Sequence, residues 1–351
     1  MQIELTFLAI FISFVASFIA CNTITPFIIR RMKMRKITLP DMNKLGQPDV
    51  AGLGGIAIFS GFTLGTMLSI FFANYLGWIN LNLELFLAGF TTIFLVMFIG
   101  IIDDVIGWKH GIRQWQHALF PIMAALPLMA VTVNNPPIIL PIIGMVPAEY
   151  FIPFIGMVSF GAIYSLFLVP IGVTGASNAT NMLAGLNGLE AGLGILILAT
   201  LFPLALIQGN MEAVILDACI LASLLAFIKF NWAPAKIFGG DSLTLLTGAS
   251  IAVVAILGDM EKIGILLMPL FFVELVLKAR SKFQADSFGK PTKNEKIISK
   301  YAKIYSITHW FMRSGKYTEK QIVIKILLLQ AIICAIVLIL YYLNSIQLLI
   351  L

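Results

Sequence analysis

The chain has 351 residues, of which 60% are hydrophobic and 11% are charged, and its formal net charge is +6. This composition excludes a soluble globular domain and predicts a polytopic membrane protein without a separate soluble domain. The three cysteines, Cys21, Cys219 and Cys334, lie in apolar runs without metal-ligand spacing, so they indicate neither a disulfide framework nor a metal site.

Counting apolar runs against the thickness of a bilayer predicts about ten membrane-spanning helices. We expect them at residues 5–29, 52–73, 83–102, 114–133, 154–169, 191–207, 211–230, 241–257, 263–277 and 326–343. The proline-rich stretch 134–153 instead predicts a small strand pair or flap outside the membrane. The predicted fold is therefore an all-α polytopic membrane protein, one integral domain over 1–351, with a long loop at 278–325 before the last helix.

Basic residues predict the orientation, because short cytosolic loops are enriched in Lys and Arg. With the N-terminus outside, the inner loops would be 30–51, 103–113, 171–190, 229–240 and 278–325, which hold all but Lys262 of the 23 basic residues. We expect the functional face to lie in the cytosol, at a prokaryotic plasma membrane or, in a eukaryote, the endoplasmic reticulum membrane. A basic face favours anionic partners, either lipid head groups or a phosphorylated substrate, and dispersed charges make nucleic acid a poor candidate.

The first inner loop contains Lys44, which can meet a phosphate. It ends in Gly52, Gly54 and Gly55, whose backbone amides could approach a phosphate at the start of the second span. Small residues at a membrane helix start also serve close packing, so that alternative stays open.

The third span ends in two adjacent carboxylates, Asp103 and Asp104. Neighbouring carboxylates repel each other, so Mg²⁺ or a basic side chain from a facing segment would be needed to keep both ionised. The alternative is a solvated pair that caps a helix end. Arg113 follows in the same loop, where its planar fork suits a diphosphate or, alternatively, lies at the membrane surface.

The loop at 171–190 is rich in asparagine at the edge of the bilayer. Asn178 and Asn181 would share one face of a helix, and Asn187 and Glu190 repeat that spacing. Unpaired polar groups at this depth are costly, so the cluster needs partners. Asn carbonyls suit Mg²⁺, and Asn amides also recognise uracil or sugar edges; hydrogen bonding between helices is the alternative.

The last two inner loops carry further polar candidates. Asp241 follows two glycines at the start of a span, where it could bind a cation or cap the helix. Phe238 could stack against a base or fill the membrane. His309 and Arg313 would share a helical face, and Glu274 is expected to pair with Lys278 four residues later.

Carboxylates, Asn ligands, basic side chains and glycines on one face favour phosphoryl transfer at the membrane edge. A transporter should instead place its polar groups near the middle of broken helices in two related halves. A lipid-phosphate flippase stays open as the alternative from another class.

The chain resembles the polyprenyl-phosphate N-acetylhexosamine-1-phosphate transferase superfamily over nearly its whole length. The motifs that carry the resemblance are DMNK with paired glycines downstream, IDDVIGW, NATNMLAGLNGLEAG, NWAPAKIFGGDS and HWFMRSG. The third and fourth look most like the eukaryotic and archaeal UDP-GlcNAc:dolichyl-phosphate GlcNAc-1-phosphate transferases, with Asn187 where bacterial members usually have Asp. The last departs from the bacterial HIHHxxMRxG pattern, because Ser306 and Thr308 replace two histidines and only His309 is kept.

The resemblance implies transfer of GlcNAc 1-phosphate, or a related HexNAc 1-phosphate, from a UDP-sugar to polyprenyl or dolichyl phosphate. UMP would be released, in the first membrane step of lipid-linked glycan synthesis. It also implies Mg²⁺, with Mn²⁺ as an alternative. By motif position, Asp103 and Asp104 would be the catalytic carboxylates, and Asn181 and Asp241 the metal ligands. The substrate-binding residues would be Lys44, Arg113, Asn187, Phe238, His309 and Arg313. Among them, Arg113 would bind the diphosphate, Asn187 and Phe238 would hold uracil, and His309 and Arg313 would face the sugar.

The sugar and the assembly stay open at this point, with another UDP-sugar as an alternative donor and a homodimer as one option. A phosphate monoester has a second pKa of about 6, so much of the lipid phosphate is dianionic at neutral pH and can attack without a strong base. We expect Asp103 and Asp104 to position the metal ion, Lys44 or the attacking phosphate. A covalent aspartyl phosphate is the less favoured alternative.

Overall fold

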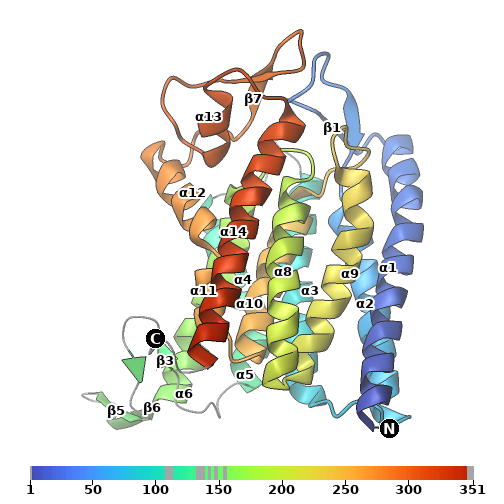
Figure 1. The fold of residues 1–351 in the computed structure, drawn as a ribbon, viewed down its shortest axis with the longest axis vertical. Helices are drawn as coiled ribbons and strands as arrows, with labels where there is room; N and C mark the ends of the chain where they lie inside the picture. Colours follow the sequence, from blue (N-terminus) through green and yellow to red (C-terminus); the bar gives the residue numbers. More distant parts are fainter. Residues whose placement is uncertain are drawn as a thin grey trace.

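Long apolar helices run between the two ends of the molecule (Figure 1). The computed structural model describes residues 2–106, 114–131, 139–140, 144–145, 149–152 and 156–345. Within them, eight helical segments are long and apolar enough to cross a bilayer. These are α1 (Gln2–Met34), α2 (Gly55–Asn74), α3 (Leu83–Ile106), the continuous α6 (Phe160–Ile163), η1 (Tyr164–Leu168) and α7 (Val169–Met182), α8 (Leu189–Gln208), α9 (Met211–Asn231), α10 (Gly240–Leu257) and α14 (Glu319–Ser345). The predicted fold class is confirmed.

The other two expected spans are each divided into two shorter helices. The first forms α4 (Gln114–Ala124) and α5 (Leu126–Val131), and the second forms α11 (Glu261–Leu266) and α12 (Pro269–Arg280). Pro127 and Pro269 stand at the first turn of the second helix of each pair. Proline has no backbone N–H to continue the hydrogen-bond ladder of the preceding helix, which accounts for both divisions.

The boundary predicted for the fifth span is wrong, because the helical stretch starts at Phe160 and continues to Met182. Most of the expected inner loop at 171–190 is thus part of a helix. Two polar side chains in it find acceptors inside the bundle: Ser177 Oγ donates to the Val173 carbonyl at 2.7 Å, and Thr180 Oγ1 donates to the Thr244 carbonyl of α10 at 2.7 Å. Polar residues satisfied in this way do not have to leave the helix for water.

Small residues let the central helices approach closely, with α9 and α10 the most enclosed of the spans. A Cβ on Gly65 of α2 would lie 1.9 Å from Ser17 Oγ of α1, and one on Gly61 would lie 2.7 Å from Ser223 Oγ of α9. These two glycines form the small-xxx-small spacing that brings membrane helices together. The packing of α1, α2 and α9 therefore depends on the absence of side chains at both positions.

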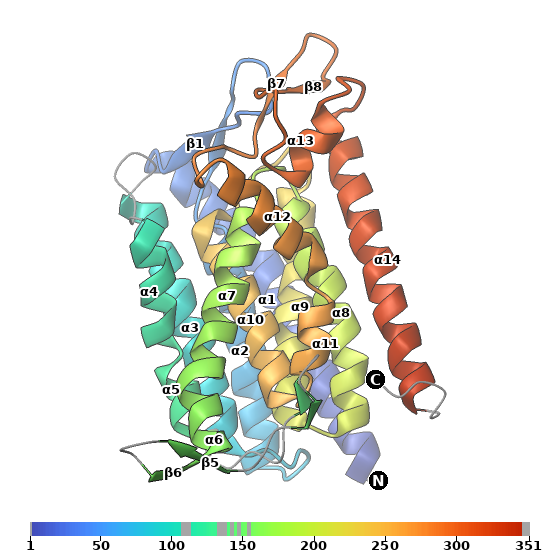
Figure 2. The same cartoon turned by 90° about the vertical axis from the view of Figure 1, so that its left-hand side faces the viewer.

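Short antiparallel hairpins lie at the two ends of the bundle (Figures 1 and 2). Strands β1 (Thr38–Pro40) and β2 (Asp49–Ala51) lie at one end with β7 (Gly289–Pro291), β8 (Ile297–Ser299) and α13 (Ile307–Met312). We call this the hairpin end. At the opposite end, where the N-terminus also lies, β3 (Ile139–Leu140) pairs with β4 (Gly144–Met145) and β5 (Glu149–Ile152) with β6 (Gly156–Ser159), which confirms strand pairing in the proline-rich stretch.

Candidate active site

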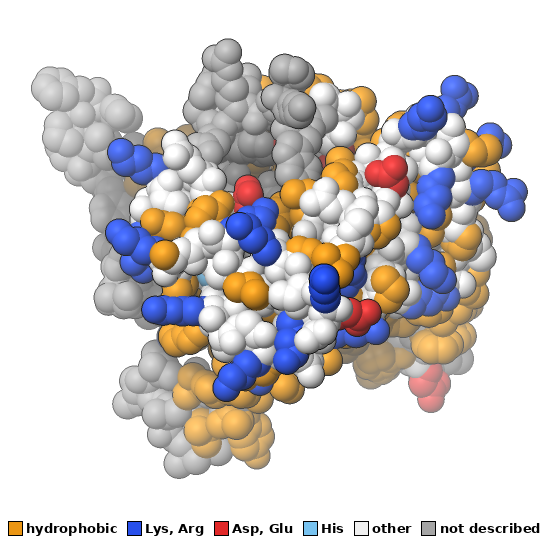
Figure 3. All heavy atoms as spheres, turned by 90° about the horizontal axis from the view of Figure 1, so that it is seen from above, with side chains coloured by type: hydrophobic (Ala, Val, Ile, Leu, Met, Phe, Trp, Pro, Cys, Tyr) orange, Lys and Arg blue, Asp and Glu red, His pale blue; other side chains and the backbone are white. Residues whose placement is uncertain are grey.

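A cavity of about 1120 Å³ lies at the hairpin end of the bundle. Its walls come from residues 39–43 at and after β1, the end of α3, α7 and the turn after it, the start of α10, and the end of α12 with the segment that follows it. Figure 3 views this end from outside and shows Lys and Arg side chains spread over it. Of the residues predicted for the site, six line the cavity: Asp103, Asp104, Asn181, Asn187, Phe238 and Asp241.

Asp104 joins the end of α3 to the start of α10. Its Oδ1 accepts a hydrogen bond from the backbone N–H of Asp241 at 2.8 Å, and its Oδ2 accepts one from Ser242 at 3.0 Å. Gly240 has a φ of +71°, and a Cβ there would lie 2.4 Å from Asp104 Oδ2. A carboxylate at a helix N-terminus satisfies free amides and opposes the positive end of the helix dipole. Asp104 thereby holds Asp241 in place.

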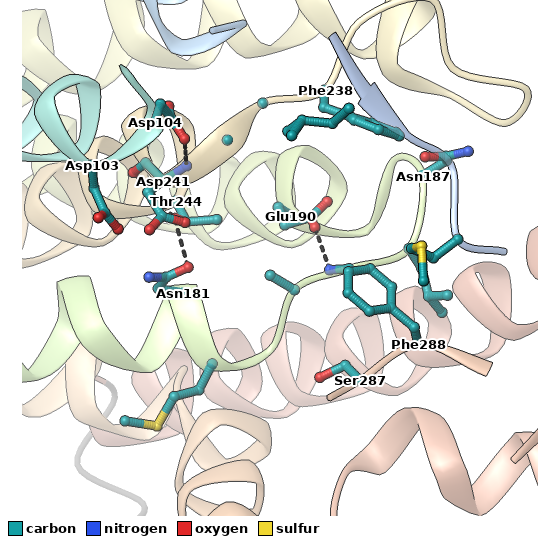
Figure 4. A pocket seen from close by; sticks show the side chains of 18 of the residues that line it. Asp103, Asp104, Asn181, Asn187, Glu190, Phe238, Asp241, Thr244, Ser287 and Phe288 are labelled. Atoms are coloured by element: carbon teal, nitrogen blue, oxygen red, sulfur yellow. Dashed lines mark hydrogen bonds between the residues drawn. The ribbon is translucent and has the colours of Figure 1, made fainter. Parts of the chain in front are cut away.

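The side chains of Asp103, Asp241 and Asn181 lie close together in the cavity (Figure 4). We call these three residues the acidic group. The Asp241 carboxyl group is within hydrogen-bonding contact of the side chains of Asp103 and Asn181. Thr244 Oγ1 donates to Asn181 Oδ1 at 3.2 Å and so orients that amide. Two carboxylates in contact repel each other unless a proton or a cation lies between them.

This donor set fits Mg²⁺ better than a softer metal. The described residues contain no group of three His, Cys, Asp or Glu side chains that could hold an ion. Two carboxylates and the second lone pair of the Asn181 oxygen, which Thr244 leaves open, are instead the kind of incomplete oxygen shell that Mg²⁺ accepts, since this ion keeps waters and substrate phosphates as its other ligands. The chemistry of Asp103, Asp241 and Asn181 is therefore compatible with the predicted ion.

Phe238 lines the cavity at some distance from the acidic group, near Asn187 (Figure 4). Its backbone is fixed by two hydrogen bonds, from its own N–H to the Ala51 carbonyl at 2.8 Å and from Gly54 N–H to its carbonyl at 2.9 Å. Gly55 N–H donates to the Gly239 carbonyl at 3.1 Å. The backbone amides of Gly54 and Gly55 thus hold the Phe238 loop in place. These glycines therefore serve close packing, and their amides do not form a phosphate site.

Glu190 lies between the acidic group and Asn187 in the cavity (Figure 4). Its Oε1 accepts a hydrogen bond from the backbone N–H of Gly185 at 2.6 Å, so the side chain is held in one orientation. The sequence singled this residue out by its spacing from Asn187 but assigned it no role. The Glu190 side chain forms part of the wall of the cavity.

The basic residues predicted to bind phosphate are placed differently. Lys44 Nζ lies 2.6 Å from Glu319 Oε2, and Lys44 is absent from the described cavity lining. Arg113 lies outside the described residues. The structure thus gives Lys44 a carboxylate partner within the protein, and phosphate binding by either residue stays a prediction.

His309 and Arg313 lie on α13 and at its end, outside the described lining of the cavity. The His309 side chain is fully buried, whereas Arg313 is exposed. Burial, and then the nearby positive charge of Lys278, lowers the pKa of His309 to about 4, so this imidazole is neutral at neutral pH. It offers no positive charge to a substrate, and contact of either residue with the sugar stays a prediction.

The end of α12 and the segment after it supply lining residues that the sequence did not reveal. The predicted pairing of Glu274 with Lys278 is confirmed, with 3.9 Å between Oε1 and Nζ. Lys278 Nζ also donates to Ser287 Oγ at 2.8 Å, and both residues line the cavity with Phe288. Helical spacing predicted the ion pair, but no signal in the sequence placed it at the site.

Comparison with known proteins places the chain in a family. Residues 86–259 match the family described as Glycosyl transferase family 4. A protein of Saccharolobus solfataricus with the provisional name UDP-N-acetylglucosamine–dolichyl-phosphate N-acetylglucosaminephosphotransferase is 34% identical, over 97% of this chain and 98% of its own. A protein of Sulfolobus acidocaldarius with the same provisional name is 33% identical, over 90% of this chain and 92% of its own.

A Bacillus subtilis protein is more distant. It is provisionally named an undecaprenyl-phosphate N-acetylglucosaminyl 1-phosphate transferase and is 27% identical, over 71% of this chain and 63% of its own. The archaeal similarity extends over nearly the whole of both chains. The chain therefore belongs to Glycosyl transferase family 4, within the polyprenyl-phosphate N-acetylhexosamine-1-phosphate transferase superfamily.

Proposed function

We propose that this protein transfers GlcNAc 1-phosphate, or a closely related HexNAc 1-phosphate, from a UDP-sugar to polyprenyl or dolichyl phosphate and releases UMP. The observation that carries the proposal is one cavity that connects the group Asp103, Asp241 and Asn181 to Phe238 and Asn187. The names of the archaeal and bacterial relatives support the same reaction. The cavity lies where spanning helices end, so a lipid head group at the membrane surface can reach it.

The charge of the cavity indicates what binding must supply. Its described lining contains five carboxylates and one basic residue, Lys278, and the carboxylates are Asp41, Asp103, Asp104, Glu190 and Asp241. A nucleotide sugar and a lipid phosphate are both anionic, so cations must accompany them. Mg²⁺ held by Asp241 and Asn181 beside Asp103 would neutralise phosphate charge and polarise a phosphoryl oxygen.

The reaction that we propose is a direct displacement. An oxygen of the lipid phosphate forms a bond to the β-phosphorus of the UDP-sugar. The bond from that phosphorus to the oxygen bridging the α-phosphate breaks, and UMP leaves with the electron pair. Both Asp104 oxygens already accept amide hydrogen bonds, so its role is to position Asp241. Asp103, whose side chain contacts Asp241 in the cavity, would face the reacting groups.

One assay tests the proposed reaction. The purified protein, supplied with labelled UDP-GlcNAc, polyprenyl phosphate and Mg²⁺, should form a lipid-linked GlcNAc diphosphate and an equal amount of UMP. Omission of the lipid phosphate should stop both products, and replacement of GlcNAc by other N-acetylhexosamines tests the sugar. If no UDP-sugar gives a lipid product, the proposal is wrong, and movement of lipid phosphate across vesicles without UMP would support the flippase alternative.

The cavity is proposed to face the cytosol, because the hairpin end carries the basic residues. Asn294 is exposed at this end and Asn80 is exposed at the other. In intact cells, a membrane-impermeant maleimide should label Asn80→Cys but reach Asn294→Cys only after permeabilisation. The native Cys21, Cys219 and Cys334 are buried and should give little background. The reverse labelling pattern would contradict the orientation.

A further inference from the structure

Asn187 belongs to a buried polar group whose members come from three distant segments. Asp41 lies in the turn between β1 and β2, Asn187 in the turn after α7, and Glu319 in the first turn of α14. Their exposed fractions are 3%, 5% and 1%. A buried polar group must satisfy its hydrogen bonds within the protein, so the orientation of each side chain is determined by its neighbours.

Two carboxylates determine which way the Asn187 amide points. Its Nδ2 donates to Asp41 Oδ2 at 2.8 Å and, more weakly, to Glu319 Oε2 at 3.4 Å. Its backbone N–H donates to Glu319 Oε1 at 2.9 Å. Ionised carboxylates only accept hydrogen bonds, so the amide nitrogen has to face them.

The amide oxygen is consequently directed the other way. Figure 4 shows the Asn187 oxygen on the side toward Phe238 and the nitrogen on the far side. Among the hydrogen bonds between described residues, none is donated to Asn187 Oδ1. The residue therefore presents an acceptor to the cavity, beside an aromatic ring on which a base can stack.

Lys44 and Asn43 contact the two carboxylates that orient the Asn187 amide. Lys44 Nζ lies 2.6 Å from Glu319 Oε2, and this ion pair holds the carboxylate in place. The backbone N–H of Asn43 donates to Asp41 Oδ1 at 3.1 Å. A protonated carboxyl group could donate and would allow the amide to turn over, so these contacts help to preserve its direction.

We infer that Asp41 and Glu319 are positioning residues that hold Asn187 as a hydrogen-bond acceptor and thereby make the site select uracil over cytosine. The inference rests on the proposed function and on the expectation, from the family resemblance, that Asn187 and Phe238 hold the base of the nucleotide sugar. Uracil has a donor N–H at ring position 3, which matches the Asn187 oxygen. Cytosine has an unprotonated nitrogen there, so two acceptors would face each other.

Nucleotide binding measures this selection without depending on turnover. Calorimetric titration of the detergent-purified, full-length protein with UMP and with CMP should show a preference for UMP of about tenfold or more, the usual cost of one mismatched hydrogen bond. Asp41→Asn introduces a side chain that can donate to a reversed Asn187 amide. This variant should reduce the ratio of the two dissociation constants severalfold, and Glu319→Gln should change it in the same direction.

An exchange variant separates positioning from general support of the fold. In Asp41→Asn/Asn187→Asp the amide and the carboxylate trade places, so an oxygen faces the cavity again and the amide at position 41 can donate to the carboxylate at position 187. This double variant should recover the UMP preference lost in Asp41→Asn. Glu261→Gln is the matched control, because Glu261 accepts a hydrogen bond from Tyr164 at the opposite end of the bundle and should leave the ratio unchanged.

The outcomes distinguish this inference from the proposed function. Equal binding of UMP and CMP by the wild type, or an unchanged ratio in folded Asp41→Asn, would overturn the inference. The proposed function would still stand if UDP-GlcNAc gave lipid product and UMP. Glu319→Gln leaves Lys44 unpaired. If that variant does not fold, the ratios of the UMP and CMP dissociation constants of Asp41→Asn and of the exchange variant test the inference without it. Failure of the exchange to restore the preference would also count against selection by an oriented amide.

Discussion

Asp241→Ala and Asn181→Ala should each lower turnover by about a hundredfold or more, because each removes an oxygen donor from the place where phosphate charge must be balanced. The contact of the Asp241 carboxyl group with Asp103 and Asn181 supports this expectation. Initial rates measured over a range of Mg²⁺ concentrations should show a much higher Mg²⁺ requirement for any activity that is left.

Asp241→Asn is the finer form of this test, because it keeps the shape of the side chain and removes its charge. Asp259→Asn is its matched control, since Asp259 is exposed near the opposite end of the bundle and has a side-chain contact with Asn210. The control should keep the wild-type rate and Mg²⁺ dependence. Wild-type behaviour of both Asp241→Ala and Asn181→Ala would rule out the proposed metal ligands.

Asp103→Asn and Asp104→Asn should both lose most activity, but only Asp104→Asn should also destabilise the fold. Asp104 accepts two backbone hydrogen bonds at the start of α10, and an asparagine there would direct its NH₂ group at one of those N–H donors. The loss of such a cap costs about 1–2 kcal/mol. Asp103→Asn removes a charge that faces Asp241 and should leave the thermal unfolding temperature unchanged or raise it.

Thermal unfolding of the purified variants, measured beside their rates, checks this difference. Equal destabilisation by the two substitutions would show that the α10 cap is not the main role of Asp104. Activity close to wild type in Asp103→Asn would remove Asp103 from the reaction.

Asp103 and Asp104 are also the residues on which the two possible mechanisms differ, direct displacement and a covalent aspartyl phosphate. In the direct route both substrates occupy the cavity together, so the enzyme should release no UMP from UDP-GlcNAc when lipid phosphate is absent. A nucleophilic aspartate would instead give a phosphoryl-enzyme, a burst of UMP and ping-pong kinetics. Rapid-quench measurement of UMP from lipid-free enzyme decides between them, and a burst equal to the enzyme concentration would overturn direct displacement.

Local chemistry was enough to predict the class of the protein, the approximate position of its helices and the end at which its polar motifs gather. The length and apolar character of a segment decide whether it can cross a bilayer, and neither depends on its neighbours. The ion pair of Glu274 and Lys278 was predictable for the same reason, because residues four apart meet on any helix. Helix boundaries were less predictable, since the polar groups of α7 find partners on α10 that only the folded bundle provides.

The roles of single residues depended on contacts between distant segments. Asp104 and Asp103 are neighbours in the sequence, yet only packing of α3 against α10 gives Asp104 the two amides that occupy it. The sequence made Lys44 a candidate for phosphate binding, whereas the fold places it beside Glu319, 275 residues away. A sequence determines which groups a side chain can bind, whereas the tertiary structure determines which of those groups is close enough to be bound.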